Sequence, residues 1–374
     1  IYLKSYDHFY IMSTIIDYIN KQTITNVIEK AIPEDKLLKF HNIINKYLKN
    51  NDNIIVKGGR ALHQSVPIYD CDELLYKDYD LYSKNPKESL IEIGKELVKC
   101  DIIEFTIENI IFKPHIFRLK IFTIPFIDVE PLSCGVPKLL LNDINVVHPK
   151  YQRIDIYIQL SRPTLINLNN WTKIIPRLEK INEKYPFKCF HKNHVGKLHH
   201  NINKILPIVE DDCVISGDVA LYHHMKDHKN NCYLPDINHL VLFTHNTTKY
   251  IKLIKYIFKN CEIKEVSGKT THYTTLYKIY DNDTLLVDLY YLDDCISYDE
   301  DDSYKYSSVN HLFFYYHMIP YSKENETILF HLHDTYGTYV NNLKCHGYRN
   351  PGVKELKTTF INREQLCKIN HLML

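Results

Sequence analysis

A short pattern of strand, glycine turn and helix occurs twice in this chain of 374 residues. Residues 55–62 (IVKGGRAL) and residues 214–221 (VISGDVAL) share a glycine, an alanine and a leucine at an offset of 159. Two of the three alanines in the whole chain fall at these matched positions, which argues against coincidence. The repeat therefore predicts a duplicated α/β unit rather than one core for the whole chain.

Around the first glycine turn, the hydrophobic pattern predicts an alternation of helices and strands. Asp78 and Asp80 lie two residues apart on one predicted strand, so both side chains face the same side of it. A third acid, Asp128, lies in the next extended segment, and Glu130 follows on the same face. The predicted elements are a helix at 37–48, a strand at 53–57, the turn Gly58–Gly59, a helix at 60–64, a strand at 76–83, a helix at 87–98 and one extended segment at 117–129.

The second copy keeps this order of elements but changes their chemistry. Residues 235–240 repeat residues 77–82 at an offset of 158. This alignment places Asp236 and Asn238 at the positions of the two strand acids, so an amide replaces one carboxylate. Residues 285–289 repeat the strand of the third acid at an offset of 160.

Composition excludes several classes of protein. Charged residues make up 24% and hydrophobic residues 45% of the chain, which is typical of a globular protein and not of a disordered or coiled-coil one. No run reaches the roughly 18 apolar residues of a membrane span, so no membrane association is expected. The ten cysteines form no C-x-x-C pair, which favours a reducing compartment over a disulfide framework. The chain starts at Ile1 without an initiator Met, so residues upstream of it are expected.

Three carboxylates on two strands beside a glycine turn suit chemistry on a nucleoside triphosphate. Mg²⁺ and Mn²⁺ prefer carboxylate oxygens, which Asp78, Asp80 and Asp128 supply. Two such ions about 3.5 to 4 Å apart would activate an attacking hydroxyl and neutralise a leaving pyrophosphate. Glu130 is a further candidate ligand, although a strand end that faces solvent would explain it equally well.

The glycine turn adds a candidate site for the phosphates. Gly58–Gly59 at a helix start would let main-chain N–H groups approach phosphate oxygens, and Lys57 or Arg60 would add positive charge. Taken singly, a D-x-D on a strand is more often polar surface, and two glycines are more often only a turn. The order of glycine turn, D-x-D strand and distal acid favours a metal site over these alternatives.

At this point the residues carry a resemblance to a known family. The segments KGGRAL (57–62), KDYDLYS (77–83) and FIDVEPL (126–132) resemble the nucleotidyltransferase signature of the polymerase-β superfamily. More narrowly, the tandem arrangement and the segment HPKYQRIDIYIQLSRP (148–163) resemble the poly(A) polymerase catalytic subunits of large DNA viruses. The resemblance is to the mimivirus and megavirus type and, more distantly, to the poxvirus subunit.

This resemblance implies template-independent addition of AMP from ATP to the 3′ end of RNA. Asp78 and Asp80 would hold both metal ions, Asp128 would act with the ion that activates the 3′-hydroxyl, and Gly58–Gly59 would seat the triphosphate. It further implies a homodimer or a viral processivity partner, and a cytoplasmic location in the viral factory or the virion. In the second copy Asp218 stands where the first has Gly59, and a fixed carboxylate there would repel a triphosphate. The second domain is therefore expected to be structural.

A basic connector joins the two copies. Between Lys173 and Lys204 there are eight Lys or Arg residues against two Glu, so we expect this segment to contact RNA phosphates. Tyr185, Phe187 and Phe190 are its candidates for stacking on bases. The alternative is a solvated, lysine-rich helix face.

The sequence thus predicts an α/β (α+β) protein with two tandem nucleotidyltransferase-like domains, the second degenerate, and helical extensions at both ends. Two alternatives for function stay open: a nucleotidyltransferase that uses another acceptor, such as a small molecule, a protein or a tRNA end, or a non-catalytic RNA-binding or scaffold subunit. The predicted parts are an N-terminal helical segment (1–50), the catalytic domain (51–170), the basic helical connector (171–205), the degenerate domain (206–320) and a C-terminal extension (321–374).

Overall fold

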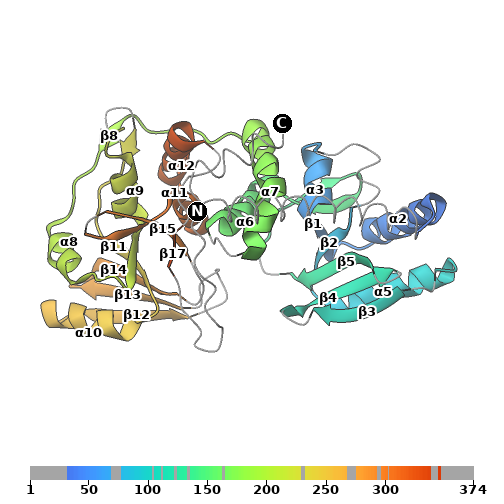
Figure 1. The fold of residues 1–374 in the computed structure, drawn as a ribbon, viewed down its shortest axis with the longest axis horizontal. Coiled ribbons are helices and arrows are strands. Elements are labelled where there is room, and N and C mark those ends of the chain that lie inside the picture. Colours follow the sequence, from blue (N-terminus) through green and yellow to red (C-terminus); the bar gives the residue numbers. More distant parts are fainter. Residues whose placement is uncertain are drawn as a thin grey trace, which may run out of the picture. The chain divides into compact units, whose positions relative to one another are not determined.

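The structure of the protein, a computed structural model, divides into two compact units, residues 1–152 and residues 153–374, which are described separately. Each unit holds one mixed β-sheet with helices packed on it (Figure 1). The finer division into five parts stays a prediction. The described residues are 32–68, 77–102, 105–110, 113–121, 124–132, 135–161, 165–228, 232–267, 275–292, 296–301, 303–337 and 344–346.

The sheet of unit 1 has seven strands in the order β3-β4-β5-β2-β1-β7-β6. The pairs β1/β7 and β2/β5 are parallel, and the other neighbours are antiparallel. The strand bounds are β1 (Ile54–Lys57), β2 (Tyr79–Ser83), β3 (Phe105–Ile110), β4 (Lys113–Ile121), β5 (Ile124–Pro131), β6 (Lys138–Leu141) and β7 (Ile144–Val147).

The prediction of one extended segment at 117–129 is wrong. The structure has two antiparallel strands there, β4 and β5, with Phe117 opposite Val129 and Leu119 opposite Ile127. Between these strands the sequence has only Phe and Thr at 122–123, without the Gly, Asn or Asp that marks most tight turns. The local sequence therefore contains no residue that would predict the reversal between β4 and β5.

Three helices of unit 1 match the predicted ones. They are α2 (Glu34–Lys49), α3 (Gly58–Ser65) and α5 (Pro86–Lys99). The apolar stripes of α2 and α5 are buried with the sheet in one hydrophobic core. Acids in the first turn of α2 and lysines in its last turn complement the helix dipole. Of the predicted N-terminal segment, residues 1–31 lie outside the described part, and α6 (Pro149–Ser161) crosses the boundary between the units.

The sheet of unit 2 has eight strands in the order β12-β13-β14-β11-β9-β16-β15-β17, and β8 pairs with β10 separately. The strands are β8 (His194–Val195), β9 (Cys213–Ser216), β10 (Tyr233–Leu234), β11 (Leu240–Thr244), β12 (Glu262–Ser267), β13 (Thr275–Asp281), β14 (Thr284–Tyr291), β15 (Ile296–Glu300), β16 (Lys305–Ser307) and β17 (Lys344–His346). The helices are α7 (Leu165–Lys184), α8 (His200–Ile205), the 3₁₀ turn η1 (Leu206–Ile208), α9 (Gly217–Met225), α10 (Thr247–Ile257), α11 (Val309–Met318) and α12 (Lys323–Tyr336).

The two sheets have the same topology. Strand for strand, β3-β4-β5-β2-β1-β7-β6 corresponds to β12-β13-β14-β11-β9-β16-β15, with the same order of parallel and antiparallel pairs. Helix α3 follows β1 as α9 follows β9, and α5 follows β2 as α10 follows β11. The predicted duplication is confirmed, and β17 is an addition to the second sheet.

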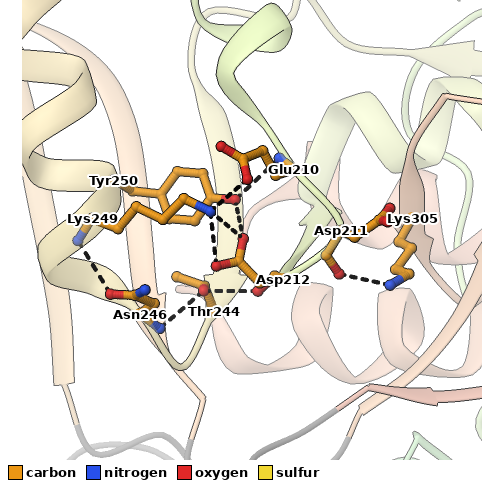
Figure 2. A network of polar contacts seen from close by, with 8 residues as sticks. All are labelled: Glu210, Asp211, Asp212, Thr244, Asn246, Lys249, Tyr250 and Lys305. Atoms are coloured by element: carbon orange, nitrogen blue, oxygen red, sulfur yellow. Dashed lines mark hydrogen bonds and ion pairs between the residues drawn. The ribbon is translucent and has the colours of Figure 1, made fainter.

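A polar network ties the start of β9 to helix α10 (Figure 2). Asp212, just before β9, accepts hydrogen bonds from Lys249 Nζ at 3.0 Å and from the Tyr250 hydroxyl at 2.6 Å. Its main-chain oxygen accepts from the Thr244 hydroxyl at 2.8 Å. The network fixes the N-terminal end of β9, opposite to the end that carries Gly217. No helix in the described part of the chain is long and apolar enough to cross a membrane.

Candidate active site

A row of charged side chains crosses four neighbouring strands of unit 1. Lys57 on β1 pairs with Asp80 on β2, Asp80 pairs with Asp128 on β5, and Asp128 pairs with Arg118 on β4. Residues directly opposite one another in a sheet project from the same face, so the two acids lie side by side with a cation beyond each. Asp78 precedes β2 by one residue and is exposed.

Two of the site's carboxylates have a cation of their own. Arg118 donates to both oxygens of Asp128, at 2.7 and 2.6 Å. Lys57 Nζ lies 2.7 Å from Oε1 of Glu130, and it also lies over the Tyr82 ring at 4.6 Å from its centroid. Glu130 is therefore part of the site's charge network rather than a solvated strand end.

Asp80 has no such partner among the described residues. Burial and the neighbouring Asp78 carboxylate raise the pKa of Asp80 from 3.8 to about 7. Lys57 opposes this shift, while the charges of Asp128 and Glu130 add to it. Four carboxylates thus stand against three cations, Lys57, Arg118 and Arg60, and the excess negative charge favours binding of a cation.

A glycine allows the Asp80 carboxylate to approach the start of α3. Gly58 has a φ of +67°, and a Cβ atom at this position would lie 2.2 Å from Oδ2 of Asp80. Any other residue at position 58 would be strained and would push the carboxylate away. Gly59 is the second residue of α3, so the main chain at this helix start is free of side chains beyond Cα.

Arg60 holds the main chain that carries the two strand acids. Its Nε donates to the carbonyl oxygens of Lys77 at 2.9 Å and Asp78 at 3.1 Å, and its Nη2 donates to Lys77 O at 2.6 Å. The guanidinium carbon lies 4.1 Å from the centroid of the Tyr79 ring. These contacts of Arg60 are all with protein groups, and they fix the segment between Lys77 and Tyr79.

Among the described residues, no group of three or more His, Cys, Asp and Glu side chains is placed to hold a metal ion as it stands. Arg118 occupies both oxygens of Asp128, and Lys57 occupies one oxygen of Glu130. The carboxylate oxygens of Asp78 and Asp80 form no hydrogen bond or ion pair within the described part of the chain. Because the donor set consists of carboxylates and the acids outnumber the cations, these residues fit a hard divalent cation.

The corresponding row in unit 2 has lost most of its acids. Ser216 pairs with Val241, Val241 with Asp288, and Asp288 with Lys278. A Cβ atom on Gly217, which has a φ of +61°, would lie 2.7 Å from Cγ2 of Val241, as Gly58 faces Asp80 in unit 1. Asp288 is therefore the counterpart of Asp128, as the sequence predicted.

The predicted positions of the other two counterparts are wrong. The strand register places His239 and Val241 at the positions of Asp78 and Asp80, three residues after Asp236 and Asn238. Asp236 accepts a hydrogen bond from the Lys197 main-chain N–H at 2.9 Å instead. The pairing of β11 with β9 and β14, which are distant in sequence, sets the register, so local similarity could not find it.

Helix α11 fills the glycine turn of unit 2. The Tyr316 hydroxyl donates to Oδ1 of Asp218 at 2.7 Å, and Tyr315 Cε1 would lie 3.6 Å from a Cβ atom on Gly217. Both tyrosines are buried. Burial raises the pKa of Asp218, and the bond from Tyr316 opposes that shift. Aromatic rings of α11 thus cover the glycine turn of unit 2.

The connector aromatics differ in accessibility. Phe187 is buried against Phe313 and the Arg153 guanidinium, so the prediction that it can stack on a base is wrong. Tyr185 is half-buried, and Phe190 is exposed. Nothing in the sequence of this basic segment distinguishes an aromatic ring that is buried in the core from one that is exposed.

Sequence reasoning missed Arg118 and assigned Lys57 only to phosphates. The pairing of Arg118 with Asp128 follows from the β4/β5 hairpin, which the sequence did not reveal. With that hairpin known, the residue opposite Asp128 is fixed by the strand register, and an arginine there would have been recognised as its partner.

Comparisons with known proteins agree with this geometry. Residues 42–165, which include all three acids, match the family described as poly(A) polymerase catalytic subunit. A search of the curated proteins finds no match. Among solved structures, the crystal structure of the Megavirus polyadenylate synthase matches with a TM-score of 0.71 and 16% sequence identity, over 98% of this chain and 83% of that one. The chain thus shares the two-domain fold of the Megavirus protein, and its residues 42–165 are similar to poly(A) polymerase catalytic subunits.

Proposed function

We propose that this protein adds AMP from ATP to RNA 3′ ends without a template and releases pyrophosphate. The observation that carries the proposal is the pairing of Asp80 with Asp128 on parallel strands, next to Asp78 and the glycine that opens α3. In the reaction the RNA 3′-hydroxyl attacks the α-phosphate of ATP in line with the leaving pyrophosphate. The family match over residues 42–165 supports this reaction over transfer to a small molecule or a protein.

Asp78, Asp80 and Asp128 are the residues that would hold Mg²⁺ or Mn²⁺. Asp128 would do so through the second lone pair of the oxygens that Arg118 binds. Two such ions would lower the pKa of the 3′-hydroxyl and offset the charge of the pyrophosphate. Asp128 stands beside Asp80 in the sheet and would help to hold the ion that activates the 3′-hydroxyl. Burial and the neighbouring carboxylates raise the pKa of Asp80, and a divalent cation would offset the negative charge that these carboxylates share.

Main-chain N–H groups of Gly58 and Gly59 would bind the triphosphate at the helix start, with Lys57 beside them. Arg60 would contribute differently. Because its guanidinium is bonded to the carbonyls of Lys77 and Asp78, we assign it the role of holding Asp78 in place rather than that of contacting phosphate.

An extension assay tests the proposed function. The wild-type protein is incubated with a labelled oligoribonucleotide, Mg²⁺ or Mn²⁺ and each of the four NTPs in parallel, and we expect elongation with ATP. Asp80→Asn should lower the elongation rate by more than about 10²-fold, because it removes preorganised charge where the reaction develops it. Elongation by Asp80→Asn at the wild-type rate, or its absence in the wild type, would refute the proposal.

Two further expectations belong to the same proposal. Association into a homodimer or with a viral processivity partner would appear as an increased mass in light scattering of the purified protein. Residence in the cytoplasm, in the viral factory or the virion, would appear in fractions of infected cells. Neither expectation affects the assignment of the catalytic residues.

A further inference from the structure

We propose that residues 188–197 (KCFHKNHVGK), here called the 188–197 segment, form a binding surface for single-stranded RNA on unit 2. The proposal rests on the proposed function, since it takes RNA as the substrate. It adds a location and a binding mode that the catalytic residues of unit 1 do not provide.

The charge of the 188–197 segment is uniformly positive. No Asp or Glu occurs between Lys184 and Val209, whereas the chain as a whole is balanced at a net charge of +1. Lys188, Lys192 and Lys197 are exposed, and none of them forms a salt bridge with an acid among the residues that the structure describes. Lysines that are not neutralised by the protein are available to phosphate oxygens.

The main chain of the segment is fixed on unit 2. Strand β8 pairs in parallel with β10, and the N–H of Gly196 donates to Leu234 O at 2.9 Å. A Cβ atom on Gly196 would lie only 2.0 Å from Pro235 O, so the glycine permits this close approach. The N–H of Phe190 donates to the Thr327 hydroxyl at 3.0 Å. A fixed backbone loses little conformational entropy on binding, which favours affinity for a flexible strand.

Aromatic rings lie among the lysines. Phe190 is 43% exposed, and Lys323 Nζ lies 5.8 Å from its ring centroid. The ring of Tyr233 stacks on that of His191 at 5.2 Å and lies 5.7 Å from that of His194. Lysines interleaved with accessible rings are what single-stranded nucleic acid requires, because phosphates pair with the lysines and bases stack on the rings.

Two acids beside the segment, Asp236 and Glu324, are engaged with the protein. Asp236 accepts from the Lys197 main-chain N–H at 2.9 Å and lies 3.8 Å from His194, and Glu324 accepts from the Tyr233 hydroxyl at 2.7 Å. An acidic peptide would use the lysines but leave the exposed ring of Phe190 unpaired. A strand of RNA uses both, and this favours RNA as the occupant.

Fluorescence anisotropy with a labelled single-stranded oligoribonucleotide, over a series of salt concentrations, tests the proposal. We expect the triple variant Lys188→Gln/Lys192→Gln/Lys197→Gln to raise Kd at least about tenfold and to reduce the salt slope by about 2, at roughly 0.7 for each lost phosphate contact. A matched control removes the same charge from and after α10, by Lys252→Gln/Lys255→Gln/Lys259→Gln, where the lysines are also exposed. The control should bind RNA as the wild type does.

A second pair of variants tests the contribution of base stacking to RNA binding. Phe190→Ala should raise Kd by about tenfold while leaving the salt slope unchanged, since a base loses its ring but no phosphate loses a lysine. Tyr256→Ala, which removes a ring that is 85% exposed on α10, should have no effect. Melting temperatures equal to that of the wild type establish that each variant is folded.

The outcomes separate this proposal from the proposed function. Equal weakening by both lysine triples, or no weakening by the first, would overturn the assignment of RNA to the 188–197 segment. So would a polyglutamate peptide that binds as tightly as RNA and is lost in the same variant. Should the wild type bind RNA through this segment but never extend it, only the proposed catalytic function fails.

Discussion

Unit 1 and unit 2 share a sheet topology and a glycine turn with positive φ, yet they differ where the chemistry would occur. In unit 1 the row contains two adjacent acids between two cations, and in unit 2 a serine and a valine replace half of it. The rows are Lys57, Asp80, Asp128 and Arg118 in unit 1, and Ser216, Val241, Asp288 and Lys278 in unit 2.

The comparison shows that the fold persists when the charged residues of the row are replaced. The strand that carries Asp288 keeps one acid, but Tyr290 replaces Glu130 on it and stacks on Phe243 at 4.6 Å. Such rings bury apolar area and stabilise the unit, whereas in unit 1 the neighbouring carboxylates add to the effect of burial in raising the pKa of Asp80. Unit 2 thus has a packed face where unit 1 has neighbouring carboxylates.

The largest expected difference in elongation rate is between a variant of Asp128 and a variant of Asp288. Asp128→Asn should lower elongation by more than about 10²-fold, because it removes one acid of the proposed metal-binding set. Asp288→Asn should change it by no more than about twofold, since unit 2 contacts no reacting group in the proposed reaction. Rates are compared at a temperature at which circular dichroism shows both variants folded. Equal losses in the two variants would mean that unit 2 is catalytic.

A smaller effect is expected at Arg60, whose counterpart in unit 2 at the offset of 159 is Val219. Arg60→Lys keeps the charge but loses the planar group that bonds the carbonyls of Lys77 and Asp78. The Mn²⁺ concentration for half-maximal rate should rise by about 10- to 100-fold, the range for residues that orient a metal ligand. A lowered melting temperature with an unchanged Mn²⁺ requirement would show a merely structural role.

The smallest expected effect is on stability and concerns the network at Asp212. Unit 1 lacks this network because its residue at the corresponding position is Asn53. Burial raises the pKa of Asp212, but bonds from Tyr250 and Lys249 outweigh it, so the pKa is lowered overall from 3.8. A lowered folded-state pKa gives stability that is present above the unfolded value and is lost as pH falls through the folded value. Asp212→Asn should therefore lower the unfolding free energy by about 1 kcal/mol at pH 7.

That difference should shrink as the pH falls below 3.8 and the wild-type carboxylate is protonated, as measured by urea unfolding of both proteins. Asn53→Ala in unit 1 serves as the control, and no such pH dependence is expected from it. A difference that stays constant down to pH 2 would show that charge at Asp212 contributes nothing.

Much of unit 1 could be predicted from local pattern. Helices α2, α3 and α5 and strands β1 and β2 follow from apolar periodicity and from the glycine turn, which act within a few residues of sequence. The β4/β5 reversal could not be predicted, because no turn residue marks it. The partner of Asp128 was missed for the same reason, since Arg118 faces it only across that hairpin.

The sequence by itself determined that the chain contains two copies of one α/β unit, that each copy opens a helix at a glycine, and that Asp78, Asp80 and Asp128 are the acids to consider. These properties depend on periodicity and residue type, which are local. Only the tertiary structure decided that Val241 and His239 stand for the missing acids, that Arg60 bonds the main chain beside Asp78, and that Phe187 is buried. Each of these depends on pairing between strands or packing between helices that are far apart in sequence, where hydrogen bonding and burial of the whole sheet set the register.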